Sequence, residues 1–161
     1  MRDVLVWIEG TGLGHFMRDT GPWTYAVVNT SHILGVAALF GSILVLDLRL
    51  LGMGRRLPVA ALASAITPVA IAGFVIAVAT GSALLATKAT AYVGNPFLLI
   101  KFPAIALGLI NVAVLNLTPA WKARGTREPS RRERRQLAVM AGISLACWVT
   151  AVSAGRMIGY W

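Results

Sequence analysis

Three basic side chains stand inside stretches that are otherwise apolar: His32, Lys101 and Arg156. Ionisable groups at membrane depth are costly, and they mark a binding site or a buried ion pair. Helix geometry places His32 about 10 Å inside Tyr25, which begins its apolar run. Lys101 and Arg156 lie about 6 Å inside the corresponding ends of their own runs. The three side chains therefore share one depth, near one face of the membrane.

No acidic side chain is expected at that depth to neutralise the two cations. Their partner would be an anionic ligand, a lipid phosphate or the propionates of a haem. Haem b would take His32 as an axial ligand, with Asn29 one helical turn away on the same face. A second imidazole would come from His15 if the N-terminal segment folded back, and Met17 and Met157 are weaker candidates. The predicted cofactor-binding residues are His32, His15, Lys101, Arg156 and Asn29, with His32 and His15 as ligands of haem iron.

Each of these residues also has a structural interpretation. Lys101 and Arg156 can snorkel to the headgroups, as long basic side chains near helix ends often do. His32 is too short to snorkel from its depth, but it can be a neutral histidine bonded to a backbone carbonyl or to Asn29. The sequence leaves these alternatives open.

No catalytic constellation is visible. No span carries paired carboxylates, and Ser, His and Asp do not share a depth. Asp47 lies about 22 Å from His32 along the same helix. It is expected to pair with a basic residue that follows it, namely Arg49, Arg55 or Arg56. The single Cys147 can form neither an intramolecular disulfide nor a thiolate cluster. This pattern favours a protein without enzymatic activity over an enzyme.

Long helices must position these residues. The chain of 161 residues is 57% hydrophobic and 13% charged, with a mean hydropathy of +0.73, which is typical of a chain whose solvent is lipid. Roughly twenty apolar residues cross a hydrocarbon core of about 30 Å. The sequence predicts an all-α, polytopic membrane protein, a four transmembrane helix bundle that forms a single integral domain. The predicted spans are about 23–50, 59–86, 97–118 and 137–159.

The N-terminal segment, residues 1–22, mixes apolar and charged residues and cannot span. Its apolar positions follow an approximately helical spacing, which favours a short amphipathic helix in the membrane interface. Gly21 and Pro22 then mark the start of the first span.

The second apolar run carries a row of small residues. Gly73, Ala77 and Gly81 recur at every fourth position, a spacing that lets another helix pack closely. Pro68 lies one turn before this row and is expected to kink the helix.

Charge predicts the orientation. The net charge is +9, and the segment 122–135 carries much of the positive charge. Such clustering beside apolar spans indicates a basic cytoplasmic loop, predicted at 120–136, rather than a nucleic-acid-binding protein. The loop after the first span is also basic, whereas the N-terminal tail and the second loop are not. We expect a multi-pass protein of the bacterial inner membrane with both termini in the periplasm.

Three segments carry a resemblance to a known family: residues 14–52, 92–111 and 154–161. On these segments the chain resembles the small four-helix bacterial inner-membrane proteins grouped as a domain of unknown function, which are distantly similar to copper-resistance D type membrane proteins. The resemblance extends over nearly the whole chain and implies a fold and a location, but no established activity. Relatives often carry a histidine in the third helix where this chain has Asn116.

The sequence supports three hypotheses. The first is a membrane module that binds a cofactor or anionic ligand at the outward-facing polar site, with haem b for electron transfer as the most concrete candidate. The second is an accessory or scaffold subunit of a larger membrane complex, with other subunits or a second copy as partners beside the lipid bilayer. The third, a small transporter or metal-handling protein, has least support because only His32 titrates near mid-membrane.

Overall fold

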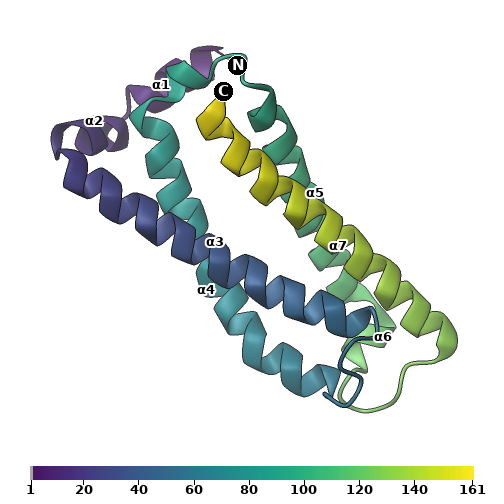
Figure 1. The fold of residues 1–161 in the computed structure, drawn as a ribbon. Coiled ribbons are helices and arrows are strands. Elements are labelled where there is room, and N and C mark those ends of the chain that lie inside the picture. Colours follow the sequence, from purple (N-terminus) through teal and green to yellow (C-terminus); the bar gives the residue numbers. More distant parts are fainter. Residues whose placement is uncertain (1) are drawn as a thin grey trace.

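Four long helices dominate the computed structural model, which describes residues 2–161 (Figure 1). Each is long and apolar enough to cross a membrane, and no strand occurs in the described part of the chain. The prediction of an all-α protein with four transmembrane helices is confirmed. These helices are α3 (Pro22–Leu50), α4 (Val59–Thr87), α5 (Pro96–Leu117) and α7 (Arg131–Met157).

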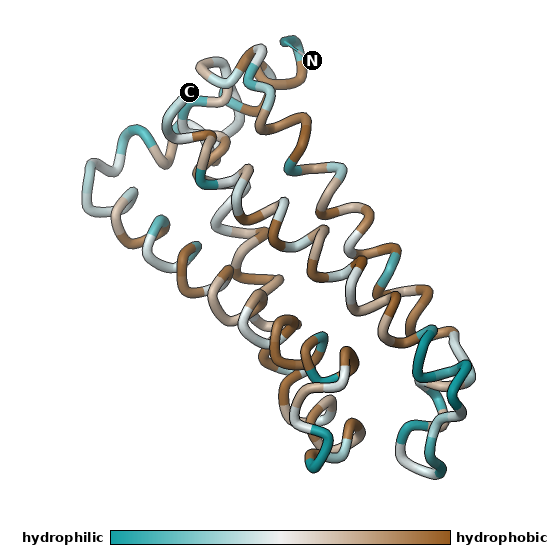
Figure 2. The backbone as a smooth tube through the Cα atoms, turned by 45° about the vertical axis from the view of Figure 1, so that its right-hand side comes forward, coloured by the Kyte–Doolittle hydropathy of each residue, from teal (hydrophilic) through white to brown (hydrophobic). Residues whose placement is uncertain are grey.

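Short elements lie at the two ends of the long helices. Both termini lie at one end, which we call the terminal end (Figure 1). Its short elements are α1 (Arg2–Glu9), α2 (Gly12–Asp19), η1 (Ala89–Tyr92) and η2 (Ile158–Tyr160). The opposite end, which we call the basic end, holds α6 (Pro119–Lys122) and the loops 51–58 and 123–130. Figure 2 shows hydrophobic residues along the long helices and a concentration of hydrophilic residues at the basic end.

The starts of the long helices follow local capping signals. Gly21 adopts a φ of 84°, a conformation that favours glycine, and Pro22 opens α3. Asn95 caps α5 by accepting a hydrogen bond from the Phe97 amide at 2.9 Å. Ser130 and Glu133 form a capping box at the start of α7.

This capping box starts α7 before the predicted fourth span. The fourth span is predicted to begin at 137 and a loop to occupy 120–136, whereas α7 begins at Arg131 and α6 forms at Pro119–Lys122. The first residues of α7 are mostly arginine and glutamate, which are good helix formers in water. The helix can therefore extend beyond the membrane. The loop between α6 and α7 is therefore shorter than predicted.

The long helices form two antiparallel pairs. α3 packs along α4, α5 packs along α7, and the pairs join where α3 contacts α7. α4 and α5 are consecutive in the chain, yet each packs mainly against another helix. The helices thus follow the spatial order α4, α3, α7, α5 (Figure 1).

Glycines set the contact between α3 and α4. A Cβ built on Gly73 would lie 2.7 Å from the Gly35 carbonyl oxygen, and one on Gly35 would lie 2.9 Å from the Ala77 nitrogen. Because no side chain separates the backbones here, the helices approach as closely as small-residue rows allow. The predicted row of Gly73, Ala77 and Gly81 is therefore the surface on which α3 packs.

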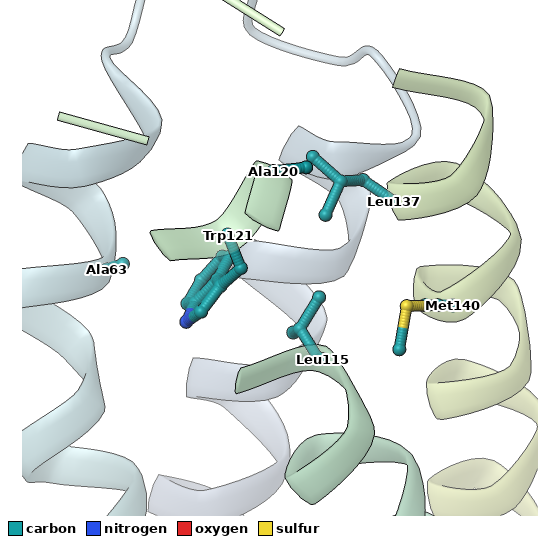
Figure 3. Close-up of a cluster of buried hydrophobic side chains, with 6 residues drawn as sticks. All are labelled: Ala63, Leu115, Ala120, Trp121, Leu137 and Met140. Carbon is teal, nitrogen blue, oxygen red and sulfur yellow. The ribbon is translucent and has the colours of Figure 1, made fainter. Parts of the chain in front are cut away.

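A tryptophan closes the basic end. Trp121 of α6 is buried, and its ring nitrogen donates to the Asn116 side chain at 3.0 Å. It belongs to a cluster contributed by α4, α5, α6 and α7 (Figure 3). The short α6 thus joins the two helix pairs at a place where α4 and α5 do not pack directly. The cluster consists of Ala63, Leu115, Ala120, Trp121, Leu137 and Met140.

The N-terminal helices fold back over the terminal end. Arg18 donates to the carbonyl oxygens of Ala86 and Thr87, both at 3.4 Å, and so satisfies the last turn of α4. The Glu9 carboxylate accepts from the Thr90 amide at 2.7 Å and from the Thr90 hydroxyl at 2.6 Å. These contacts attach α1 and α2 to α4 and η1.

Candidate functional site

His32 lies on α3, half-buried, and faces α4. Its Nδ1 lies 3.1 Å from the Thr80 hydroxyl oxygen. A Cβ on Gly81 would lie 2.9 Å from the His32 ring carbon Cε1, so the glycine provides the space that the imidazole occupies. Within residues 2–161 no hydrogen bond joins His32 to Asn29, the partner considered from sequence. The neighbouring helix supplies the partner instead.

The Thr80 contact favours one tautomer of His32. The Thr80 hydroxyl donates to the Ile76 carbonyl at 2.5 Å, so its oxygen is an acceptor toward the imidazole. A neutral His32 then carries its proton on Nδ1 and leaves the lone pair of Nε2 available. Histidines that bind metals are commonly oriented through their other nitrogen in this way.

Lys101 lies half-buried on α5 and extends over Gly155 of α7. A Cβ on Gly155 would lie 3.6 Å from the Lys101 Nζ, so this glycine leaves room for the side chain. Among the described residues, Lys101 forms neither a hydrogen bond nor an ion pair. It lies near enough to His32 for the two groups to interact electrostatically. An unneutralised ammonium and an imidazole, carried by different helix pairs, thus lie within electrostatic range of each other.

Arg156, unlike His32 and Lys101, lies at the surface of the protein. It is exposed, donates to the Tyr160 hydroxyl at 2.6 Å and stacks over the same ring at 4.8 Å from its centroid. It is adjacent in sequence to Gly155, on which Lys101 lies, but its charge is directed to the surface of the terminal end. This geometry agrees with snorkelling.

The remaining predicted residues are dispersed. His15 is exposed on α2, and its Nδ1 lies 3.3 Å from Arg18, on an element separate from the α3–α4 contact that holds His32. Asn29 is half-buried on α3. Of the two weaker ligand candidates, Met17 is buried in α2 and Met157 is exposed at the end of α7. Residues 2–161 contain no group of three or more His, Cys, Asp or Glu side chains able to hold a metal ion.

The predicted ion pair between Asp47 and a following arginine is wrong. Asp47 is buried with 4% of its surface exposed, near the basic end, within reach of the Ser144 hydroxyl on α7. It forms no ion pair within residues 2–161, and its Oδ2 has no hydrogen-bond partner. Arg49 instead donates to the carbonyl oxygens of Leu57 and Arg55, at 2.6 and 3.1 Å. Arg49, one of the arginines expected to neutralise Asp47, is therefore bound to carbonyl oxygens of the loop instead.

Two contact residues, Thr80 beside His32 and Ser144 beside Asp47, were not predicted from the sequence. Thr80 has only its position next to Gly81, the last residue of the small-residue row, as a signal. Ser144 is a single serine in an apolar helix and gives no signal by itself. Each becomes informative only when the partner helix is known.

Comparison with known proteins does not place this chain in a family. No protein-family model, no curated protein and no solved structure matches it. The resemblance described above stays a prediction, and function has to be argued from the geometry.

Proposed function

We propose that this integral membrane protein binds an anionic ligand in the half of the membrane nearest the terminal end, between its two helix pairs. Lys101 would supply the cation and His32 the free Nε2. The observation that carries the proposal is the half-buried Lys101 ammonium, which has no acidic partner in the described chain and lies near an oriented imidazole. An ionisable group at membrane depth is costly and by default marks a functional site, which supports a ligand as the partner of Lys101.

Haem b is the ligand that would use both groups. His32 Nε2 fits an axial ligand because Thr80 holds the other nitrogen. Lys101, and Arg156 at the surface, would pair with the propionates. His15 would serve as a second axial ligand only after leaving Arg18. A haem held in this way would give the protein a role in electron transfer.

Absorption spectra of protein purified gently from its native membrane test the haem proposal. A Soret band with sharp α and β bands after dithionite reduction is expected in the wild type and in His15→Ala if His32 is the sole protein ligand. The band should be lost in His32→Ala. A wild type without a Soret band after haem supplementation, or a spectrum unchanged by His32→Ala, would refute haem binding.

A colourless anion needs a different measurement. Native mass spectrometry of the wild type should show a retained mass that disappears in Lys101→Met and persists in Lys88→Met, where the replaced lysine is exposed. If the wild type carries no added mass and Lys101→Met is otherwise unchanged, the ligand proposal fails. Stoichiometric co-purification of other chains would instead support the accessory-subunit hypothesis.

We also propose that the basic end faces the cytoplasm of a bacterium and the terminal end its periplasm. The support is that Arg49, Arg55, Arg56 and the segment 122–135 all lie at one end. In a Cys147→Ser background, Lys88→Cys should react with a membrane-impermeant maleimide in intact spheroplasts. Arg56→Cys should react only after lysis, and the opposite pattern would reverse the orientation.

A further inference from the structure

A groove of about 680 Å³ runs between α5 and α7 on the outside of the helix pair. Its walls are exposed apolar side chains from both helices, among them Leu107, Ile110, Val139 and Ile143. Its polar end lies at the basic end of the bundle, where Arg132 and Arg135 line it. The groove therefore combines a long apolar floor with two cations at one end.

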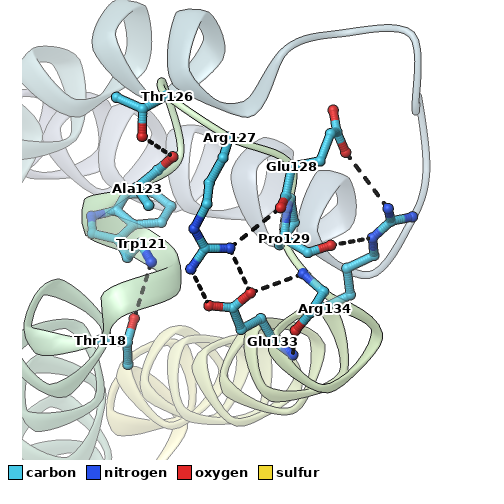
Figure 4. A network of polar contacts seen from close by, with 10 residues as sticks. Thr118, Trp121, Ala123, Thr126, Arg127, Glu128, Pro129, Glu133 and Arg134 are labelled. Carbon is cyan, nitrogen blue, oxygen red and sulfur yellow. Dashed lines mark hydrogen bonds and ion pairs between the residues drawn. The ribbon is translucent and has the colours of Figure 1, made fainter.

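The two arginines are free to meet a ligand. In the same region Arg127 pairs with Glu133 at 2.6 Å, and Arg134 pairs with Glu128 at 3.6 Å (Figure 4). Among the described residues, Arg132 and Arg135 form no ion pair and no hydrogen bond. The acidic side chains of this segment thus neutralise the arginines away from the groove, and the positive charge left over borders it.

The depth of the groove matches one leaflet. α7 is 27 residues long, about 40 Å at 1.5 Å per residue, and therefore exceeds a hydrocarbon core of about 30 Å. Arg132 and Arg135 precede the apolar run that begins at Leu137, which places them at headgroup level. Val139 to Cys147 covers about 12 Å below them, close to the length of an acyl chain within a leaflet of about 15 Å.

We infer that this groove binds one anionic phospholipid of the leaflet at the basic end. Arg132 and Arg135 contact its phosphate, and one acyl chain lies along Val139, Ile143 and Ile110. Guanidinium groups suit this role because they donate paired hydrogen bonds to phosphate oxygens. The site lies at the end of the bundle opposite His32 and Lys101, and it is independent of the function proposed above.

Native mass spectrometry in detergent tests the inference with two lipids of equal chain length, dioleoylphosphatidylglycerol and dioleoylphosphatidylcholine. The wild type should retain the anionic lipid at least about tenfold more tightly. The double variant R132Q/R135Q should weaken binding of the anionic lipid by about 25-fold, because each arginine contributes about fivefold near a membrane surface. Ile143→Trp, which fills the apolar floor, should weaken both lipids.

The matched control is R56Q/R131Q, which removes the same charge from the same end but from residues outside the groove. Its binding of phosphatidylglycerol should stay close to that of the wild type. Equal retention of the two lipids, or equal losses in the two double variants, would overturn the inference, because the charge would then act diffusely.

Disulfide cross-linking through Cys147 tests the alternative that a second copy of the chain occupies the groove. Cys147 lines the groove and is the single cysteine. With copper phenanthroline in liposomes of phosphatidylglycerol, the wild type should stay monomeric on a non-reducing gel. A disulfide-linked dimer would show that the groove is a protein interface and would overturn the lipid assignment.

Discussion

His32 and Thr80 join α3 to α4 through a hydrogen bond of 3.1 Å. Forty-eight positions separate them in the chain, and Gly81 leaves the space that lets the ring reach across. Because the Thr80 proton is given to Ile76, the contact also orients the imidazole. One threonine thus decides which nitrogen of His32 is free.

Thr80→Val should change the tautomer of His32. Without an acceptor for Nδ1–H, the Nε2–H form gains population, and the protein loses about 0.6 kcal/mol, the average of hydrogen bonds between membrane helices. Nitrogen NMR of histidine-labelled protein in micelles reads the tautomer directly. Thr30→Val, at an exposed threonine of α3, the helix that carries His32, is the control. An unchanged tautomer in Thr80→Val would refute the orientation.

Gly73→Val should separate α3 from α4. The added side chain would meet the backbone of Leu39 and Gly35, and overpacking of this kind costs about 1–3 kcal/mol. Thermal unfolding in detergent measures the loss. Gly142→Val is the matched control because a Cβ there meets nothing within 4 Å, so equal destabilisation by the two variants would contradict the close crossing.

Trp121→Ala should loosen the basic end. The ring is 6% exposed, and its removal from a packed cluster costs about 3–5 kcal/mol. Trp23→Ala removes a side chain that is 83% exposed and should leave unfolding in the same detergent nearly unchanged. If the two variants unfolded at the same temperature, Trp121 would not connect the helix pairs.

Acid should release the N-terminal helices. Hydrogen bonds from the Thr90 side chain and amide lower the pKa of Glu9 below its ordinary value of 4.5. Since the folded state favours the ionised form, the stabilisation is complete above that ordinary value. It is lost as the pH falls through the lowered pKa.

Amide exchange measures this release. The protection factor of the Thr90 amide, corrected for intrinsic exchange, should fall in acid, and Glu9→Gln should show the same low protection at neutral pH. Asp3→Asn, in the same helix α1, should behave as the wild type. Protection that is independent of pH would show that Arg18 alone attaches the N-terminal helices.

The amino-acid sequence by itself determined the four spans. A long apolar run in lipid must form a helix, because lipid offers no partner to its backbone groups. The small-residue row that packs on α3 also followed from local spacing. The start of α7 at Arg131 could have been predicted, because Ser130 and Glu133 have the spacing of a capping box.

Only the tertiary structure decided which helices pair. Chain order favours a contact between α4 and α5, but their faces pack on α3 and α7, and α6 joins the pairs through Trp121. His32 forms its hydrogen bond with Thr80 rather than with Asn29, and Asp47 is buried near Ser144 rather than paired with an arginine. These outcomes depend on the rotation of each helix about its axis. Packing against neighbouring helices sets that rotation, and a uniformly apolar sequence does not encode it locally.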